Sequence, residues 1–552
     1  MPSRPHTLRA RCPRRTFLAL VAAGALLAAP GFPGPVTQLA AQHAEHEETT
    51  GDEVRLYTGI GTLSRSITTT NPQAQAFFDQ GLRLTYGFGH PEGIRAFREA
   101  QALDPECASC FWGEAWALGP HINGAMRNEV VPAAHAAVRR AMELADGASD
   151  VERALIDALA TRYAETPEAV PRAALDSAYA QAMEEVAARF PRDLEVLTLL
   201  GEAHMVLRPW DYWAEDGSPQ PGADRAVEVL EQALAVDVGH PGACHLYIHL
   251  VEASPDPARA APCAELLEDA IPGVSHIPHM PSHIYMRIGR YGDAVRGNQR
   301  AWVADQRADD DGPPGVYTTH NLHMLAFAAS FDGQSAVAVQ AARNLAALSA
   351  GSSFYVPLTL ARFGRWDEIL ATPVDEAADF RAGVYHVARG LARLRLDDPM
   401  RAELELGTLD RLREEVPETA RFRGHLQRDL LGMARGILAG EILAARGEVN
   451  AAVEALEAAL ELELGLAYDE PEPWTIPVRH FLGAVLLEAD RNADAEAVYR
   501  ASLDVHPDNG WALLGLAAAL RARGAEDEAD RVEADGRRAF ERADVWIRGS
   551  RF

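Results

Sequence analysis

A spacing of 34 residues recurs along this chain of 552 residues. His245 and His279 are separated by 34 residues, and so are His249 and His283. Because two pairs of the same residue type share one offset, the spacing indicates that a single structural unit is repeated. A unit of this length is too small to bury its apolar face alone, so successive copies are expected to stack on one another.

The same period governs small and large apolar residues. Gly81, Leu84, Phe97, Ala100 and Pro105 occupy positions 8, 11, 24, 27 and 32 of a unit that is counted from 1 to 34. The clearest copy lies near the C-terminus and has residues at 7, 8, 11, 20, 24 and 32, namely Leu482, Gly483, Leu486, Ala495, Tyr499 and Pro507. A small residue at position 8 lets two helices approach closely, and large residues at 11 and 24 fill the gap. Proline at 32 ends the second helix.

This pattern resembles the tetratricopeptide repeat (TPR), a helix-turn-helix module of 34 residues. The resemblance extends over most of the chain from Asn71 to Phe540. It implies an all-α fold, a TPR-type α-solenoid of stacked helical hairpins with a concave inner surface. A peptide or protein partner is expected in that groove. Residues 350–357 are a candidate joint, so we predict an N-terminal stack over 71–350 and a C-terminal stack over 351–552.

The N-terminus is typical of a targeting segment. Arg14 and Arg15 precede an apolar run from Leu18 to Ala29, which resembles a twin-arginine signal and is too short to span a bilayer. We therefore predict a signal peptide over 1–41 and export to the periplasm or the extracellular space. An uncleaved signal anchor is the alternative. Residues 42–70 are polar and weakly periodic, which predicts a disordered leader or an extended arm. No membrane span is expected in the mature chain.

Charge and cysteine content narrow the partners further. The formal net charge of −28 argues against nucleic acid and anionic membranes as partners. Four cysteines remain after the signal, and an even number in an exported protein is compatible with two disulfides. These candidates are Cys107, Cys110, Cys244 and Cys263. Free buried thiols, redox catalysis and metal binding are the alternatives for the C-x-x-C pair.

Eight histidines lie between His240 and Phe331. In the TPR family, positions 2, 5, 9 and 12 of the first helix of each hairpin face the concave surface. If Gly289 and Gly333 each occupy position 15, most of the histidines fall on these inward positions in three consecutive repeats. Pro278 and Pro281 interrupt the first turn of the middle helix, so an irregular segment is expected there.

Imidazoles that face one another across packed helices can share a metal ion. The predicted metal ligands are His245, His249, Glu252, His276, His279, His283, His320 and His323. Met286 is a candidate soft ligand, and Tyr247 and Tyr285 are candidate donors to the ligands. Imidazole suits copper, zinc and iron, so a monovalent or divalent ion of one of these metals is the expected cofactor.

Three functions remain open at this stage. The first is an exported TPR solenoid that binds a peptide or protein and holds a histidine-rich metal site on its concave face. The second is a metal-free interaction scaffold in which the histidines form ordinary hydrogen bonds. The third is a metal-dependent hydrolase or oxidase built into the solenoid. Two other segments are assigned structural roles: Trp210 as a loop anchor, and 470–474 as a rigid turn without chemistry.

Overall fold

The computed structural model describes residues 54–214, 216–308, 311–373 and 380–552. The predicted signal peptide, and the leader up to residue 53, therefore lie outside the described residues. Within the described ranges the chain is almost entirely helical. One short antiparallel pair, β1 (Arg421–Phe422) and β2 (His425–Leu426), interrupts the helices. The all-α prediction is confirmed.

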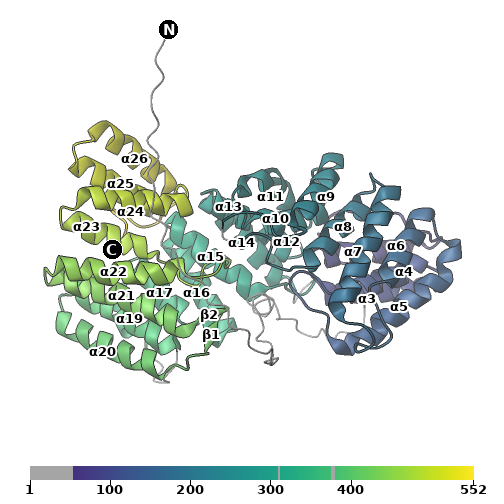
Figure 1. Ribbon diagram of the computed structural model, residues 1–552, viewed down its shortest axis with the longest axis horizontal. Helices are drawn as coiled ribbons and strands as arrows, with labels where there is room; N and C mark the ends of the chain where they lie inside the picture. Colours follow the sequence, from purple (N-terminus) through teal and green to yellow (C-terminus); the bar gives the residue numbers. More distant parts are fainter. Residues whose placement is uncertain (1–53, 215, 309–310, 374–379) are drawn as a thin grey trace, which may run out of the picture.

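The helices follow one another as antiparallel hairpins (Figure 1). The N-terminal part contains α2 (Pro72–Tyr86), α3 (His90–Leu103), α4 (Ala108–Ala117), η1 (Asn128–Val130), α5 (Val131–Leu144), η2 (Ala145–Gly147), α6 (Asp150–Ala160), α7 (Arg172–Arg189), α8 (Leu194–Val206) and α9 (Ala223–Val236). The middle part contains α10 (Pro241–Val251), η3 (Pro257–Ala260), α11 (Ala261–Leu267), α12 (His276–His279), α13 (Pro281–Arg287), α14 (Tyr291–Gln306), α15 (Thr318–Asp332) and α16 (Ser335–Leu348). The C-terminal part contains η4 (Ala350–Ser352), α17 (Tyr355–Arg362), α18 (Trp366–Ala371), α19 (Phe380–Arg395), α20 (Pro399–Glu415), α21 (Gln427–Ala445), α22 (Val449–Leu464), α23 (Val478–Glu488), α24 (Asn492–Val505), α25 (Gly510–Ala522) and α26 (Glu526–Ala539).

Glycines at fixed repeat positions explain how the hairpins pack. A Cβ added to Gly81 would lie 2.7 Å from the Phe97 ring, and one added to Gly483 would lie 2.5 Å from the Tyr499 ring. Real Cβ atoms do not approach other atoms so closely, so position 8 requires glycine where position 24 is aromatic. Gly289 connects the two helices of its hairpin at a φ of +79°, which favours glycine. These hairpins are of the TPR type, as the sequence predicts.

The segment 54–70 packs along the N-terminal hairpins without forming a strand. Arg65 forms ion pairs with Asp193 and Glu195, with N–O distances of 2.9 and 2.6 Å. The Thr68 backbone N–H donates to Glu152 at 2.7 Å. Residues 54–70 thus link helices that are distant in the sequence.

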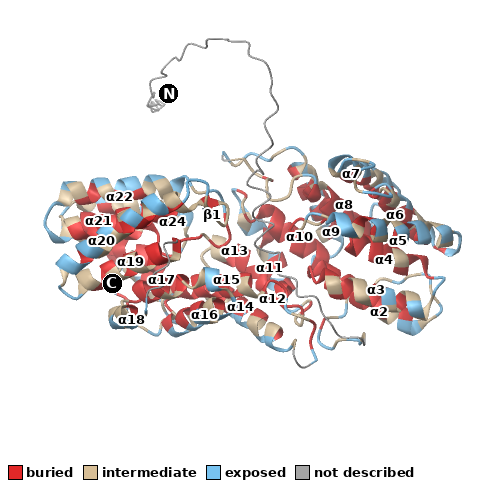
Figure 2. Ribbon diagram, turned by 90° about the horizontal axis from the view of Figure 1, so that it is seen from below, coloured by how far each residue is buried: buried red, intermediate tan, exposed pale blue. Residues whose placement is uncertain are grey.

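The two expected stacks share one continuous hydrophobic core. Figure 1 shows α2–α9 at one end, α19–α26 at the other, and α10–α15 between them. The C-terminal stack folds back on α15, where the indole N–H of Trp511 donates to the Ser330 carbonyl at 3.0 Å. Figure 2 shows that buried residues run through all three regions. The core therefore passes through the predicted joint at 350–357 without a break.

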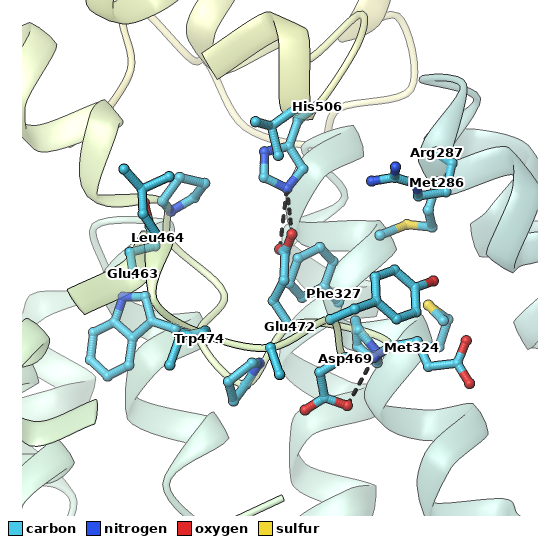
Figure 3. A pocket seen from close by; sticks show the side chains of 18 of the residues that line it. Met286, Arg287, Met324, Phe327, Glu463, Leu464, Asp469, Glu472, Trp474 and His506 are labelled. Atoms are coloured by element: carbon cyan, nitrogen blue, oxygen red, sulfur yellow. Dashed lines mark hydrogen bonds and ion pairs between the residues drawn. The ribbon is translucent and has the colours of Figure 1, made fainter. Parts of the chain in front are cut away.

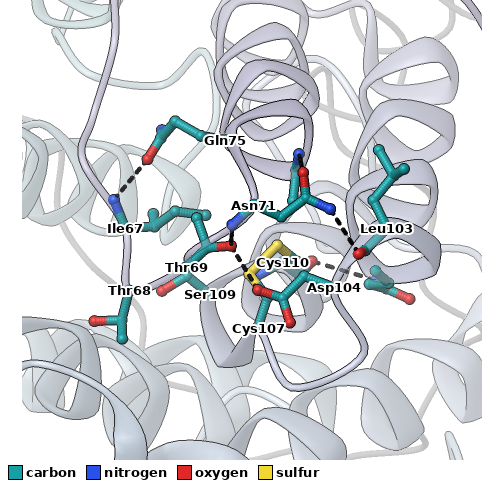
Figure 4. Close-up of a disulfide and its surroundings, with 12 residues drawn as sticks. Ile67, Thr68, Thr69, Asn71, Gln75, Leu103, Asp104, Cys107, Ser109 and Cys110 are labelled. Atoms are coloured by element: carbon teal, nitrogen blue, oxygen red, sulfur yellow. Dashed lines mark hydrogen bonds between the residues drawn. A yellow bond between two sulfur atoms is a disulfide. The ribbon is translucent and has the colours of Figure 1, made fainter.

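The four candidate cysteines form two disulfides. Cys107 bonds to Cys110 at the start of α4, and Cys244 of α10 bonds to Cys263 of α11. Figure 4 shows the first bond beside Asn71, whose side-chain amide donates to the Leu103 carbonyl at 2.8 Å. The first disulfide thus closes the N-terminal turn of α4, and the second joins the neighbouring helices α10 and α11. Of the described helices, none has the length and apolar character needed to cross a bilayer.

Candidate metal centre

Three helical layers in the middle of the solenoid supply the predicted ligands. The first layer is α10, the second is the pair α12 and α13, and the third is α15. Met280 connects α12 to α13, and Pro278 and Pro281 flank it, so the middle layer is broken as the two prolines predict. Because of this break, His276 and His279 lie on a four-residue helix and His283 lies on the next one.

The first cluster consists of His245, His249 and His276, and we call it the first triad. Each residue offers one nitrogen, and the three nitrogens lie within 4.8 Å of one another. The ring centroids of His245 lie 4.9 Å from those of both His249 and His276. The Nδ1 of His245 is 2.6 Å from the Tyr86 carbonyl, which leaves Nε2 for a ligand. All three side chains are buried.

The second cluster consists of His279, His283 and His320, and we call it the second triad. Its three nitrogens also lie within 4.8 Å of one another, and all three residues are buried. The Nε2 atoms of His279 and His283 are 2.8 Å apart. His279 Nδ1 is held by the side-chain oxygen of Asn298 at 2.6 Å. A histidine ligand whose other nitrogen is fixed in this way has a defined ring orientation.

The two triads are neighbours. The centroids of His276 and His279 are 5.5 Å apart, and those of His249 and His283 are 5.6 Å apart. The six imidazoles therefore form one continuous cluster that spans all three helical layers. Such a set is rich enough to hold two ions, and zinc, copper, iron and nickel are the metals that imidazole favours.

Glu252 and Glu470 lie beside both triads. Glu252 Oε2 is 2.7 Å from His283 Nδ1, and Oε1 is 3.2 Å from His249 Nδ1. Glu470 forms an ion pair with His283 and joins His249 and Glu252 in a third group of ligand atoms within 4.8 Å. Tyr468 donates its hydroxyl hydrogen to Glu252 Oε2 at 2.9 Å. Glu252 is thus placed to orient one imidazole of each triad.

Burial and charge set the protonation of the cluster. Burial lowers the pKa of His249, and burial together with His249 lowers the pKa of His245 well below its usual range. Burial also acts to lower the pKa of His283, but the carboxylates of Glu470 and Glu252 outweigh it and raise that pKa to about 10. Burial and Glu252 raise the pKa of Glu470 well above its usual range. His245 and His249 are therefore neutral at pH 7, which is the form of imidazole that coordinates a metal.

An aromatic wall covers the first triad, and its backbone is strained. The centroid of Phe88 is 4.4 Å from His245, that of Trp210 is 5.1 Å from His249, and that of Tyr317 is 5.0 Å from His276. These three aromatic residues have φ values of +61°, +63° and +57°. Bulky residues rarely adopt positive φ, and such strain clusters at functional sites. The predicted loop anchor Trp210 is therefore part of this wall.

Five predicted residues lie outside the triads, and one of them, Glu252, lies beside both. His323 is directed to the C-terminal stack, where its Nδ1 is 3.0 Å from Arg423 and its ring is 4.2 Å from that of Tyr355. Tyr247 donates to Glu231 at 2.6 Å, and the ring of Tyr285 lies under Arg290 at 4.4 Å. Within the part of the chain that the structure describes, these contacts of His323, Tyr247 and Tyr285 do not reach the triads. Met286 lines a cavity together with His283.

The sequence interpretation missed the segment that contains Glu470. Residues 470–474 were expected to form a turn without chemistry, but Glu470 is 3% exposed and lies against His283 and Glu252. Phe88 was also missed, as was the neighbouring pair His90 and His121, whose rings stack at 4.2 Å. Phe88 falls at position 15 of its repeat, as Gly289 and Gly333 do in theirs. None of these residues belongs to the repeated histidine pattern, so spacing gave no signal for their contacts.

The same segment encloses a cavity of about 270 Å³ next to the second triad (Figure 3). His283 and Glu470 contribute to its lining, as do Met324 and Phe327 of α15. Figure 3 also shows Glu472 and His506 on its wall, with an Oε1–Nε2 distance of 2.9 Å. The metal-ligand cluster therefore has a cavity at one side and the aromatic wall at the other.

Comparisons with known proteins add little to this geometry. No protein-family profile and no curated protein matches the chain. Similar solved structures include the human IFIT1 dimer with PPP-AAAA, which is 12% identical, with 83% of this chain and 88% of that chain covered and a TM-score of 0.29. Yeast Tom70 is 12% identical, with 85% and 92% covered and a TM-score of 0.26. Such low scores support no inference about function.

The fold and the cluster together define an all-α solenoid with a histidine-rich interior. Its hairpins, with glycine at position 8 against an aromatic residue at position 24, are those of a TPR-type solenoid. The chain is thus an all-α solenoid of helical hairpins whose middle repeats bring imidazoles and carboxylates together.

Proposed function

We propose that this protein is an exported metal-binding TPR solenoid that holds two transition-metal ions in its middle repeats. One ion would be held by the first triad and the other by the second triad, with Glu252 and Glu470 beside them. The observation that carries the proposal is the pair of adjacent, buried groups of three imidazoles. Copper, zinc and iron all suit this donor set.

The buried nitrogens of the first triad support the proposal independently. His245 Nε2 and His249 Nε2 are buried and have no hydrogen-bond partner among the residues that the structure describes. Burying a polar group without a partner costs roughly 2–7 kcal/mol, depending on the reference state. An ion would use both lone pairs and remove that cost. In a metal-free scaffold, these two buried nitrogens would keep the cost of having no partner.

Elemental analysis of protein purified without a histidine tag tests the metal sites. We expect close to two ions of copper, zinc or iron per chain. His249→Gln should lower the content by about one ion through the first triad, and His283→Gln by about one through the second. His386→Gln is the matched control, because His386 of α19 pairs with Glu405 of α20 and belongs to neither triad. If the purified protein contains no metal and added ions do not change its melting temperature, the metal sites are refuted and the metal-free interaction scaffold remains.

Export is the second part of the proposal and rests on the N-terminal sequence. The pair Arg14 and Arg15 before the apolar run is the supporting feature. Replacing both arginines with lysine is expected to retain the chain in the cytoplasm, whereas the unchanged chain reaches the periplasm. A peptide or protein partner for the concave groove stays a prediction. Turnover that follows metal content would favour the enzyme alternative.

A further inference from the structure

We propose that the cavity beside the second triad binds a small neutral phenol, with its ring in the cavity and its hydroxyl at the His283 and Glu470 end. This extends the proposed function, and it rests on that function only for the contact between the phenol and a bound ion. The cavity itself is formed by the protein alone.

The composition of the wall favours an aromatic ring. Side chains with apolar surfaces come from α13, α15, the end of α22 and the segment that follows it. They are Met286, Met324, Phe327, Leu464, Leu466, Pro471, Pro473, Trp474 and Pro477. Thioethers and aromatic rings both make favourable contacts with a bound aromatic ring. Polar and charged residues complete the lining, with His283 and Glu470 beside the second triad, and a pocket that combines apolar surface with placed polar groups is typical of a small-molecule site.

The size of the cavity excludes a peptide. Pockets for drug-sized ligands measure roughly 300–1,000 Å³, and this one is about 270 Å³. A single substituted ring is therefore the appropriate scale. A peptide or protein partner, if there is one, would therefore bind elsewhere on the concave surface.

Charge selects a neutral ligand over an anionic one. Asp469 is neutralised by Arg423 at 2.5 Å, and Glu472 is paired with His506. Arg287 donates from Nε to the Glu252 carbonyl at 3.1 Å, which positions this cation but leaves its charge. The residues with carboxyl groups on the wall, Glu463, Asp469, Glu470 and Glu472, outnumber the arginines. Arg479 also lines the wall. The formal net charge of −28 repels an anion before it arrives.

The protein's own phenol shows what the inner end recognises. Tyr468 lines the cavity, and its hydroxyl donates to Glu252 Oε2 at 2.9 Å although its side chain is 38% exposed. The tyrosine ring thus lies at the border of cavity and solvent while the hydroxyl reaches the buried carboxylate. A ligand phenol that lies alongside this ring meets the second acceptor, Glu470, and the edge of His283.

Isothermal titration calorimetry on metal-free and on metal-loaded protein tests the proposal with 4-methylphenol as the probe. We expect binding to both forms, and at least tenfold weaker binding of benzoate and of cyclohexanol. Ala467 lines the cavity and is exposed, so a tryptophan there should fill the cavity without disturbing the core. We expect Ala467→Trp to weaken the binding of 4-methylphenol at least tenfold. Ala493→Trp, at the exposed opposite end of α24, is the matched control and should change nothing.

Several outcomes would overturn the proposal. Unchanged affinity in the Ala467→Trp variant, or benzoate that binds as tightly as 4-methylphenol, places the ligand elsewhere or refutes its class. In protein loaded with cobalt(II), 4-methylphenol should shift the visible absorption, and binding without a shift refutes the orientation toward His283. Protein that takes up no metal refutes the two-ion function, yet calorimetry on the metal-free form still decides whether the cavity binds a phenol.

Discussion

Phe88, Trp210 and Tyr317 adopt backbone conformations that cost free energy, and all three lie against the first triad. A left-handed conformation costs a non-glycine residue roughly 1–2 kcal/mol. The surrounding loops must supply that free energy, because the strain would otherwise relax. The strain thus marks the aromatic wall as a part of the site that is held in place rather than packed by chance.

A pair of substitutions at Phe88 separates strain from packing. Both Phe88→Ala and Phe88→Gly remove a buried ring, but only glycine accepts a φ of +61° without strain. We expect the glycine variant to be the more stable by about 1 kcal/mol, measured by urea unfolding of the metal-free protein. Phe78 is equally buried but helical, so there Phe78→Ala should be the more stable by about 1 kcal/mol. If the alanine variant is the more stable one at both positions, the backbone of Phe88 is not strained.

The sequence predicts which histidines lie together where the same residue type recurs with the 34-residue period. His245, His249, His276, His279, His283 and His320 are brought together because each recurs on an inward repeat position. His323 is three residues after His320 on α15, yet it contacts Arg423 of the C-terminal stack. Spacing alone does not tell which neighbour a side chain meets. Glu470 and Phe88 come from connecting segments, whose paths follow from tertiary packing rather than from periodicity.

At the scale of elements, the hairpins can be predicted from the sequence, because the residues that shape each hairpin lie within one 34-residue unit. Glycine allows close packing, an aromatic residue fills the gap, and proline ends the second helix. The connection before α15 is different, since a buried carboxyl supports it. Asp305 of α14 accepts a hydrogen bond from Asn321 at 3.5 Å, and burial raises its pKa from 3.8 to about 7. No repeat pattern predicts this group, because the following residues 307–317 interrupt the period.

Asp305 should make the protein less stable as pH rises. The folded chain keeps the proton up to about pH 7, whereas the unfolded chain loses it near pH 3.8, so stability falls as pH rises through this window. The shift corresponds to roughly 4 kcal/mol. Asp305→Asn is neutral at every pH, and its melting temperature should therefore exceed that of the unchanged protein at pH 8 but not at pH 4. Melting curves that stay parallel across this range would contradict the assignment.

At the scale of the whole molecule, the candidate centre lies where the two stacks meet. The segment between α22 and α23 reaches back to the middle repeats, and Tyr468 and Glu470 contact Glu252 and His283 there. A second contact joins the same stacks through Arg542 and Asp332 at 2.7 Å. The solenoid period predicts that hairpins stack in order, but it does not predict that the last ones fold back on α15.

Metal binding should therefore stabilise the C-terminal stack as well as the middle repeats. A ligand that binds only the folded state at 100 times its Kd contributes roughly 2.7 kcal/mol, and Glu470 transmits part of this to α23–α25. We expect hydrogen exchange in α23–α25 to slow at least fivefold on metal loading, and Glu470→Gln to remove most of that effect. Glu472→Gln is the matched control, because Glu472 pairs with His506 and belongs to no ligand group. If metal slows exchange only in α10–α15 of the unchanged protein, the two stacks are independent and Glu470 does not couple them.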